Sequence, residues 1–107
     1  MATLSTHVLD TALGRPAAGV AVTLATPDGE RLGDGVTDAD GRVGAVGPGR
    51  LPPGDYVLTF ATGDYHRVTG QEGFYPTVAV TFTLGDAEHY HVPLLLNPYG
   101  YSTYRGS

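Results

Sequence analysis

The chain has 107 residues, of which 41% are hydrophobic, and it carries a formal net charge of -5 with no cysteine. These values predict one domain over residues 1–107 with a modest core, and they exclude disorder, disulfides and a cysteine nucleophile. All six basic residues are scattered arginines, which argues against a nucleic-acid partner. Because the first residues contain no apolar run suited to export or membrane spanning, we expect a cytoplasmic protein with no membrane partner.

Sixteen glycines and eight prolines divide the chain into short segments rich in Val, Thr, Leu and Tyr, which favours an all-β domain. We expect about eight strands and one short helix, arranged as a two-sheet sandwich. The third and fourth strands are expected to form a hairpin around the turn Asp38–Gly41. The expected strands are 4–9, 20–25, 30–37, 42–46, 56–61, 77–84, 89–96 and 99–105, and the helix is 63–71.

Histidines are the first chemical signal in the sequence. His89 and His91 share one face of an expected strand, and His7 lies on the outer face of the first strand. Three imidazoles in this pattern would suit zinc, and they would equally suit the exposed face of an edge strand. His66, in the expected helix, is interpreted as a surface or packing residue.

Arginine is the second signal. Arg42 follows the turn Asp38–Gly41 at the head of a short strand, where its guanidinium could present a fork of donors to a planar or anionic ligand. A solvated arginine at the end of a strand is the alternative interpretation. Arg105, near the last residue, has the same ambiguity.

Four motifs together identify a family. The segments Ser5–Asp10 (STHVLD), Thr37–Arg42 (TDADGR), His89–Leu96 (HYHVPLLL) and Tyr104–Ser107 (YRGS) resemble those of the 5-hydroxyisourate hydrolases, the transthyretin-related enzymes of the urate pathway. Their order and spacing fit over Leu4–Ser107. The final tetrapeptide distinguishes these enzymes from transthyretin itself, a hormone carrier with the same fold.

The resemblance implies a transthyretin-like (prealbumin-like) sandwich. It also implies hydrolysis of 5-hydroxyisourate, a small molecule of purine catabolism, at a ring amide to give 2-oxo-4-hydroxy-4-carboxy-5-ureidoimidazoline. The resemblance further implies a cyclic amidase that needs no cofactor and forms a homotetramer. In that dimer of dimers, two sandwiches join edge to edge through their last strands, and the sites lie in a channel between dimers.

The resemblance assigns catalytic positions to His7, Arg42, His91 and Ser107, and substrate-binding positions to His7, Arg42 and Tyr104, with no metal ligand. Either histidine could be the general base that activates water. Arg42 would stabilise the charge that develops on the attacked carbonyl oxygen. Tyr104 and the hydroxyl and terminal carboxylate of Ser107 would orient the substrate. His89 is given a supporting or structural role.

Two other classes stay open. A transthyretin-like domain can be a non-catalytic module that binds a small ligand, and Leu51–Tyr56 resembles the turn that enters a strand in many such sandwiches. A zinc hydrolase that uses His7, His89 and His91 is the other.

Overall fold

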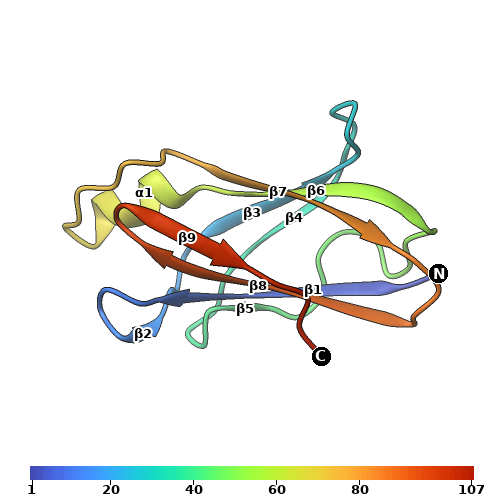
Figure 1. The fold of residues 1–107 in the computed structure, drawn as a ribbon, viewed down its shortest axis with the longest axis horizontal. Helices are drawn as coiled ribbons and strands as arrows, with labels where there is room; N and C mark the ends of the chain where they lie inside the picture. The colour runs from blue at the N-terminus through green and yellow to red at the C-terminus, as the bar shows by residue number, and fades with distance from the viewer.

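The computed structural model describes residues 1–107 as two β-sheets packed face to face, with one short helix at one end of the sandwich (Figure 1). This architecture confirms the expected all-β sandwich. The helix is too short and too polar to span a membrane. The elements are β1 (Thr3–Asp10), β2 (Arg15–Pro16), β3 (Ala21–Ala25), β4 (Arg31–Val36), β5 (Arg42–Val43), β6 (Gly54–Phe60), α1 (Thr62–Val68), β7 (Val78–Leu84), β8 (His89–Asn97) and β9 (Gly100–Thr103).

The first sheet has the strand order β2-β1-β8-β9, and β5 also pairs with β1. The second sheet has the order β4-β3-β6-β7. Only β1 and β8 pair in parallel, in a register that runs from Thr3 opposite His89 to Asp10 opposite Leu96. This pairing places the first strand beside the next-to-last one in the middle of the first sheet, as the blue β1 and the orange-red β8 of Figure 1 show.

Alternating apolar residues build the core between the sheets. Tyr56, Leu58 and Phe60 of β6 are buried while the residues between them are partly exposed, as a strand with one covered face requires. The same period on β8 buries its apolar residues and turns the histidines outward. The alternation predicted from the sequence is therefore confirmed on both central strands.

The expected hairpin between the third and fourth strands is wrong. β4 pairs with β3 in the second sheet, whereas β5 pairs with β1 in the first. The turn between them crosses from one layer to the other, and at its start the buried Thr37 hydroxyl donates to the Ala17 carbonyl and accepts the Val20 N–H. β5 is accordingly shorter than expected.

Two further differences are small. The two-residue strand β2 has no periodic pattern and was not expected. The helix is confirmed, although it begins at Thr62 and ends at Val68 rather than at Gln71, because the chain turns at Gly70, which has a φ of 72°.

The buried carboxylate of Asp10 ties the helix to the end of β1. Oδ1 accepts the backbone N–H groups of Ala12 and Leu13, and Oδ2 accepts the Tyr65 hydroxyl at 2.6 Å and the Gln71 amide at 3.0 Å. Desolvation by burial would raise the pKa of Asp10, but these hydrogen bonds together lower it below its ordinary value. Burial, and to a smaller extent the hydrogen bond to Asp10, raise the pKa of Tyr65 to about 12. Tyr65 therefore stays protonated and donates its hydroxyl proton to Asp10.

Removing this donor should destabilise the sandwich. We expect Tyr65→Phe to lower the free energy of unfolding by about 1–3 kcal/mol, because the buried carboxylate loses a hydrogen bond. A lowered pKa stabilises the folded state above the ordinary pKa of an aspartate, and that contribution is lost as pH falls through the folded-state pKa. The difference between the two proteins should therefore shrink in acid.

Urea unfolding at several pH values measures this dependence. Tyr56→Phe is the matched control, because the buried Tyr56 hydroxyl donates to the neutral Pro52 carbonyl. The free energy of unfolding that Tyr56→Phe removes should not change with pH. Equal pH dependence in the two variants would contradict the role assigned to Asp10.

Candidate active site

A polar cleft of about 400 Å³ opens on the outer face of the first sheet. It contains all five site residues expected from the resemblance, which come from β1, β5, β8 and the C-terminal segment. The residues that line it are Ser5, His7, Arg42, His89, His91, Pro93, Tyr104, Gly106 and Ser107.

The register between neighbouring strands determines which polar side chains of the cleft lie next to one another. His7 on β1 lies opposite Arg42 on β5, and Ser5 on β1 lies opposite His91 on β8. The imidazole centroids of His7 and His91 are 6.4 Å apart. Gly41 has a φ of 76°, and a Cβ there would stand 2.4 Å from the Val8 carbonyl oxygen. A glycine before Arg42 is thus what allows β5 to approach β1.

The proton position on His7 follows from its hydrogen bond. Nε2 lies 2.9 Å from the Asp40 carbonyl oxygen. Because a carbonyl only accepts, Nε2 carries a proton, and a neutral His7 ring has its lone pair on Nδ1. The turn Asp38–Gly41 therefore sets both the position of Arg42 and the tautomer of His7.

His91 is held from behind by Ser5. Its Nδ1 lies 2.7 Å from the Ser5 hydroxyl, and its Nε2 makes no hydrogen bond within the chain. Burial lowers the pKa of His91 below its ordinary value of 6.5, and electrostatic repulsion from Arg42, and from His7 and His89 when they are protonated, lowers it further. His91 is therefore neutral at neutral pH, with an imidazole nitrogen free to accept a proton.

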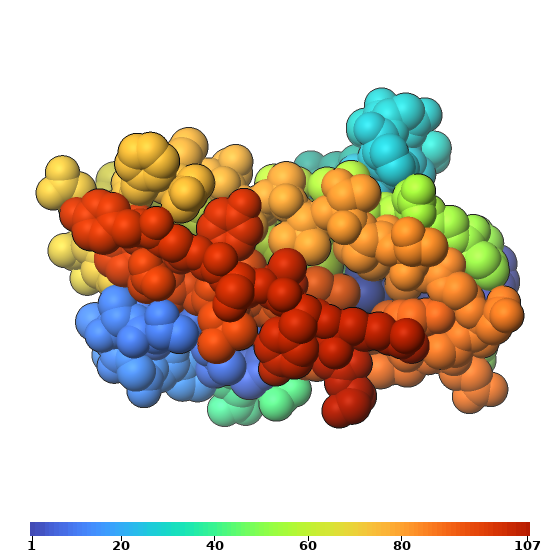
Figure 2. Space-filling model, in the orientation of Figure 1, coloured from blue at the N-terminus to red at the C-terminus, as the bar shows by residue number.

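The C-terminal segment is tied to the same strand. β9 pairs with β8 from Asn97 opposite Gly100 to Leu94 opposite Thr103, and beyond it the Gly106 N–H donates to the His91 carbonyl at 2.8 Å. A Cβ on Gly106 would come within 2.7 Å of the His91 ring. The segment lies across the surface in Figure 2, and these bonds hold it against β8.

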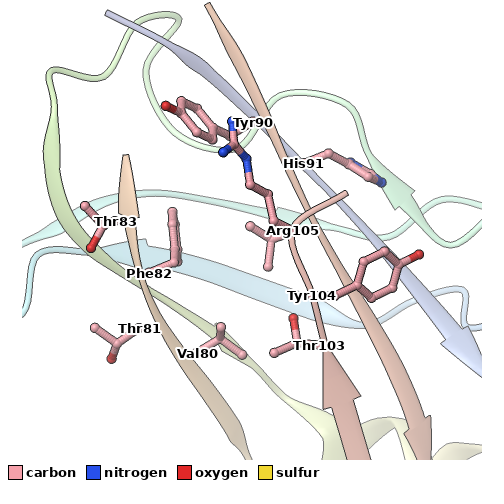
Figure 3. Close-up of a pocket in the computed structure, with 10 residues that line it drawn as sticks. Val80, Thr81, Phe82, Thr83, Tyr90, His91, Thr103, Tyr104 and Arg105 are labelled. Atoms are coloured by element: carbon pink, nitrogen blue, oxygen red, sulfur yellow. The ribbon is translucent and has the colours of Figure 1, made fainter. Parts of the chain in front are cut away.

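Arg105 faces away from the cleft. Its guanidinium lies 4.7 Å from the centre of the Tyr90 ring, a cation–π contact. The Tyr90 hydroxyl in turn accepts the backbone N–H groups of Gly85 and Ala87. Figure 3 shows Arg105 and Tyr90 beside a second, more apolar pocket of about 300 Å³ between β7 and β9. Arg105 thus fastens the segment that carries Tyr104 and Ser107.

The geometry does not favour the zinc alternative. Both ring nitrogens of His89 lie within hydrogen-bond distance of hydroxyls, those of Thr3 and Ser5, and no group of three or more His, Asp or Glu side chains in the chain could hold a metal ion. His66 is buried and outside the cleft, so it is a packing residue.

Sequence reasoning did not select Ser5, although it lines the cleft between two histidines. Its place two residues before His7, on the same strand face, was the available signal.

The fold and the cleft together define a transthyretin-like sandwich with a histidine and arginine site on one sheet. A family model described as the HIUase/Transthyretin family matches residues 4–106. The 5-hydroxyisourate hydrolase of Mesorhizobium japonicum is 48% identical to this chain, over 97% of the chain and 91% of that protein. The chain belongs to the HIUase/Transthyretin family.

Solved structures agree with this assignment. The 5-hydroxyisourate hydrolase of Klebsiella pneumoniae superposes with a TM-score of 0.91 at 44% identity, covering 99% of this chain and 100% of that chain. Sea bream transthyretin in complex with thyroxine superposes with a TM-score of 0.87 at 32% identity, covering 97% of this chain and 94% of that chain. The transthyretin-like fold expected from the sequence is confirmed.

The charge of Arg42 should be visible in the titration of His91. We expect His91 to titrate below pH 6.5, and Arg42→Gln to raise its pKa, because one positive charge near the imidazole is removed. Histidine chemical shifts measured by NMR over pH report both values. Arg31 is an exposed arginine of β4 outside the cleft. The control variant Arg31→Gln should leave the pKa of His91 unchanged. An unchanged pKa in Arg42→Gln would contradict this electrostatic account.

Proposed function

We propose that this chain is a 5-hydroxyisourate hydrolase that opens the six-membered ring of its substrate by adding water to a ring amide, giving 2-oxo-4-hydroxy-4-carboxy-5-ureidoimidazoline. The observation that carries the proposal is the convergence of His7, Arg42 and His91 with the C-terminal segment in one cleft. Relatives that cover nearly the whole chain bear this enzyme's name.

His91 is the general base in this proposal. Its lowered pKa keeps the ring neutral at neutral pH, and Nε2 is free while Nδ1 is held by Ser5. Nε2 takes a proton from water as the water oxygen bonds to the carbonyl carbon of the amide. The C–N bond then breaks, and the proton passes to the leaving ring nitrogen.

Arg42 stabilises the transition state. Negative charge grows on the carbonyl oxygen during attack, and the Arg42 guanidinium, which lines the cleft, is placed to stabilise it. His7, with Nδ1 as an acceptor, aligns the water or a ring N–H of the substrate. Tyr104 and Ser107 supply further hydrogen bonds that orient the planar ring.

The active form in this proposal is a homotetramer, a dimer of dimers. β7 and β9 are free sheet edges on the same side of the sandwich, and aromatic side chains remain exposed beside them, with Phe74, Tyr99 and Tyr101 at 69%, 71% and 43% exposure. Edge strands with exposed aromatic residues are aggregation-prone unless another chain covers them. Arg42 and Tyr104 are also exposed in one chain, so a channel between subunits would enclose the site.

The remaining parts of the proposal rest on the expectations from composition and from the family resemblance. Residues 1–107 act as a single hydrolase domain, the reaction uses no cofactor, and the protein works in the cytoplasm.

The assay is the absorbance decay of freshly generated 5-hydroxyisourate with and without the protein. Single changes of His7, Arg42 or His91 to Ala should lower turnover by roughly a hundredfold or more, because each removes the aligning acceptor, the charge or the base that the transition state needs. Near-normal turnover in a folded variant would remove that residue from the catalytic set.

Arg31→Ala and Arg67→Ala are matched controls. Each of these arginines forms an exposed ion pair with an aspartate three residues away, outside the cleft. Such pairs contribute little to stability, so turnover should stay close to that of the wild type.

A second prediction links assembly to activity. Deleting Tyr104–Ser107 should abolish turnover while the sandwich still folds, because none of these residues belongs to the core. Light scattering gives the mass, circular dichroism reports the fold, and the absorbance assay gives the rate. A fully active monomer of either the intact or the truncated chain would defeat the proposal that the tetramer completes the site.

A further inference from the structure

A continuous series of hydrogen bonds runs behind His91 from the cleft to the surface. Nδ1 of His91 lies 2.7 Å from Ser5 Oγ, and the same oxygen lies 3.0 Å from Nε2 of His89. The other nitrogen of His89, Nδ1, lies 2.6 Å from Thr3 Oγ1. Ser5 is buried between the two rings, whereas His89 is exposed to solvent.

One arrangement of protons satisfies every bond in this series. Thr3 Oγ1 lies 3.4 Å from the Glu88 carbonyl, which can only accept, and when it donates there it accepts the Nδ1–H of His89. Nε2 of His89 then accepts the Ser5 hydroxyl, and Ser5 Oγ accepts the Nδ1–H of His91. The lone pair of His91 is then on Nε2, the nitrogen that takes a proton from water in the proposed mechanism.

With one further proton added at Nε2 of His91, the bonds between the two rings are also satisfied in the opposite direction. If Nε2 of His89 carries a proton and donates to Ser5, the Ser5 hydroxyl donates to Nδ1 of His91. His91 then carries its only proton on Nε2, and His89 carries a proton on both ring nitrogens. Uptake of one outside proton at Nε2 of His91, together with the movement of two protons along the bonds through Ser5, therefore converts His91 from a base into an acid without breaking any contact.

Electrostatics favour such a transfer. A proton added to His91 places an imidazolium beside the Arg42 guanidinium, whose charge, after burial, lowers the pKa of His91. His89 is at the solvent-exposed end of the series, where water stabilises the charged form. A positive charge is thus better placed on His89 than on His91.

We propose that Ser5 and His89 form a proton relay that holds, on His89, the proton that His91 removes from water. As Nε2 of His91 gains the water proton, its Nδ1 proton moves to Ser5 Oγ, and the Ser5 proton moves to Nε2 of His89. When the C–N bond breaks, each proton moves back, and Nε2 of His91 delivers its proton to the leaving nitrogen. No proton is gained or lost over the cycle, and Ser5 and His89 are positioning residues that act through His91.

The relay rests on the proposed hydrolase activity, and substitutions of His89 separate proton transfer from simple orientation. His89→Gln keeps an amide oxygen that can accept the Ser5 hydroxyl, but it cannot hold an extra proton. We expect His89→Ala and His89→Gln both to lower kcat by roughly tenfold to a hundredfold, as for outer partners of a functional histidine, with little change in KM.

Imidazole in the buffer provides the decisive readout. Because His89 is exposed, free imidazole can occupy the space left in His89→Ala and take up the proton, so it should restore kcat. Glu88 is an exposed neighbour whose side chain makes no hydrogen bond. The control variant Glu88→Ala should therefore show no loss of kcat and no effect of imidazole. Wild-type kcat in His89→Gln, or no effect of imidazole on His89→Ala, would overturn the relay.

Two further measurements keep the relay separate from the proposed function. If the wild type itself fails to accelerate 5-hydroxyisourate decay, the proposed function fails. The relay bonds are then judged by nitrogen NMR of His91, in which Ser5→Ala should reduce the population protonated on Nδ1. An unchanged tautomer of His91 would contradict the hydrogen-bond series, whatever the activity.

Discussion

The parallel pairing of β1 with β8 is the constraint on which the rest of the structure depends. Its register sets Ser5 opposite His91 and Thr3 opposite His89, and β5 adds Arg42 opposite His7 on the other side of β1. Side chains alternate along a strand, so one register buries the apolar residues of β8 and turns its histidines toward the cleft. A slip by one residue would exchange the core face and the site face.

Charge explains why this site is coupled to the chain end and to the surface. Arg42 favours a negative transition state but disfavours a protonated His91. A general base next to a guanidinium therefore needs somewhere to place its proton, and the hydrogen bonds through Ser5 lead to the solvent. The backbone bond from Gly106 to the His91 carbonyl holds the last residues next to the same imidazole.

Much of this structure could be predicted from the sequence, for physical reasons that differ between elements. Period-2 alternation in β6 and β8 identified the strands and their buried faces, and the histidines followed from the same alternation. Alternation says which face is buried but not which sheet a strand joins, so the crossing between β4 and β5 was missed. The site residues lie in short motifs and converge as expected, whereas Ser5 has no chemical signal until its two imidazole partners are placed.

The central claim is that the cleft of His7, Arg42 and His91, rather than the apolar pocket beside Arg105, binds the substrate. A crystal structure with uric acid, a stable and planar purine trione, tests this most directly. We expect the ring to lie in the cleft, with a carbonyl oxygen within hydrogen-bond distance of the Arg42 guanidinium and Nε2 of His91 facing the ring. A ligand bound only between β7 and β9, with an empty cleft, would contradict the account.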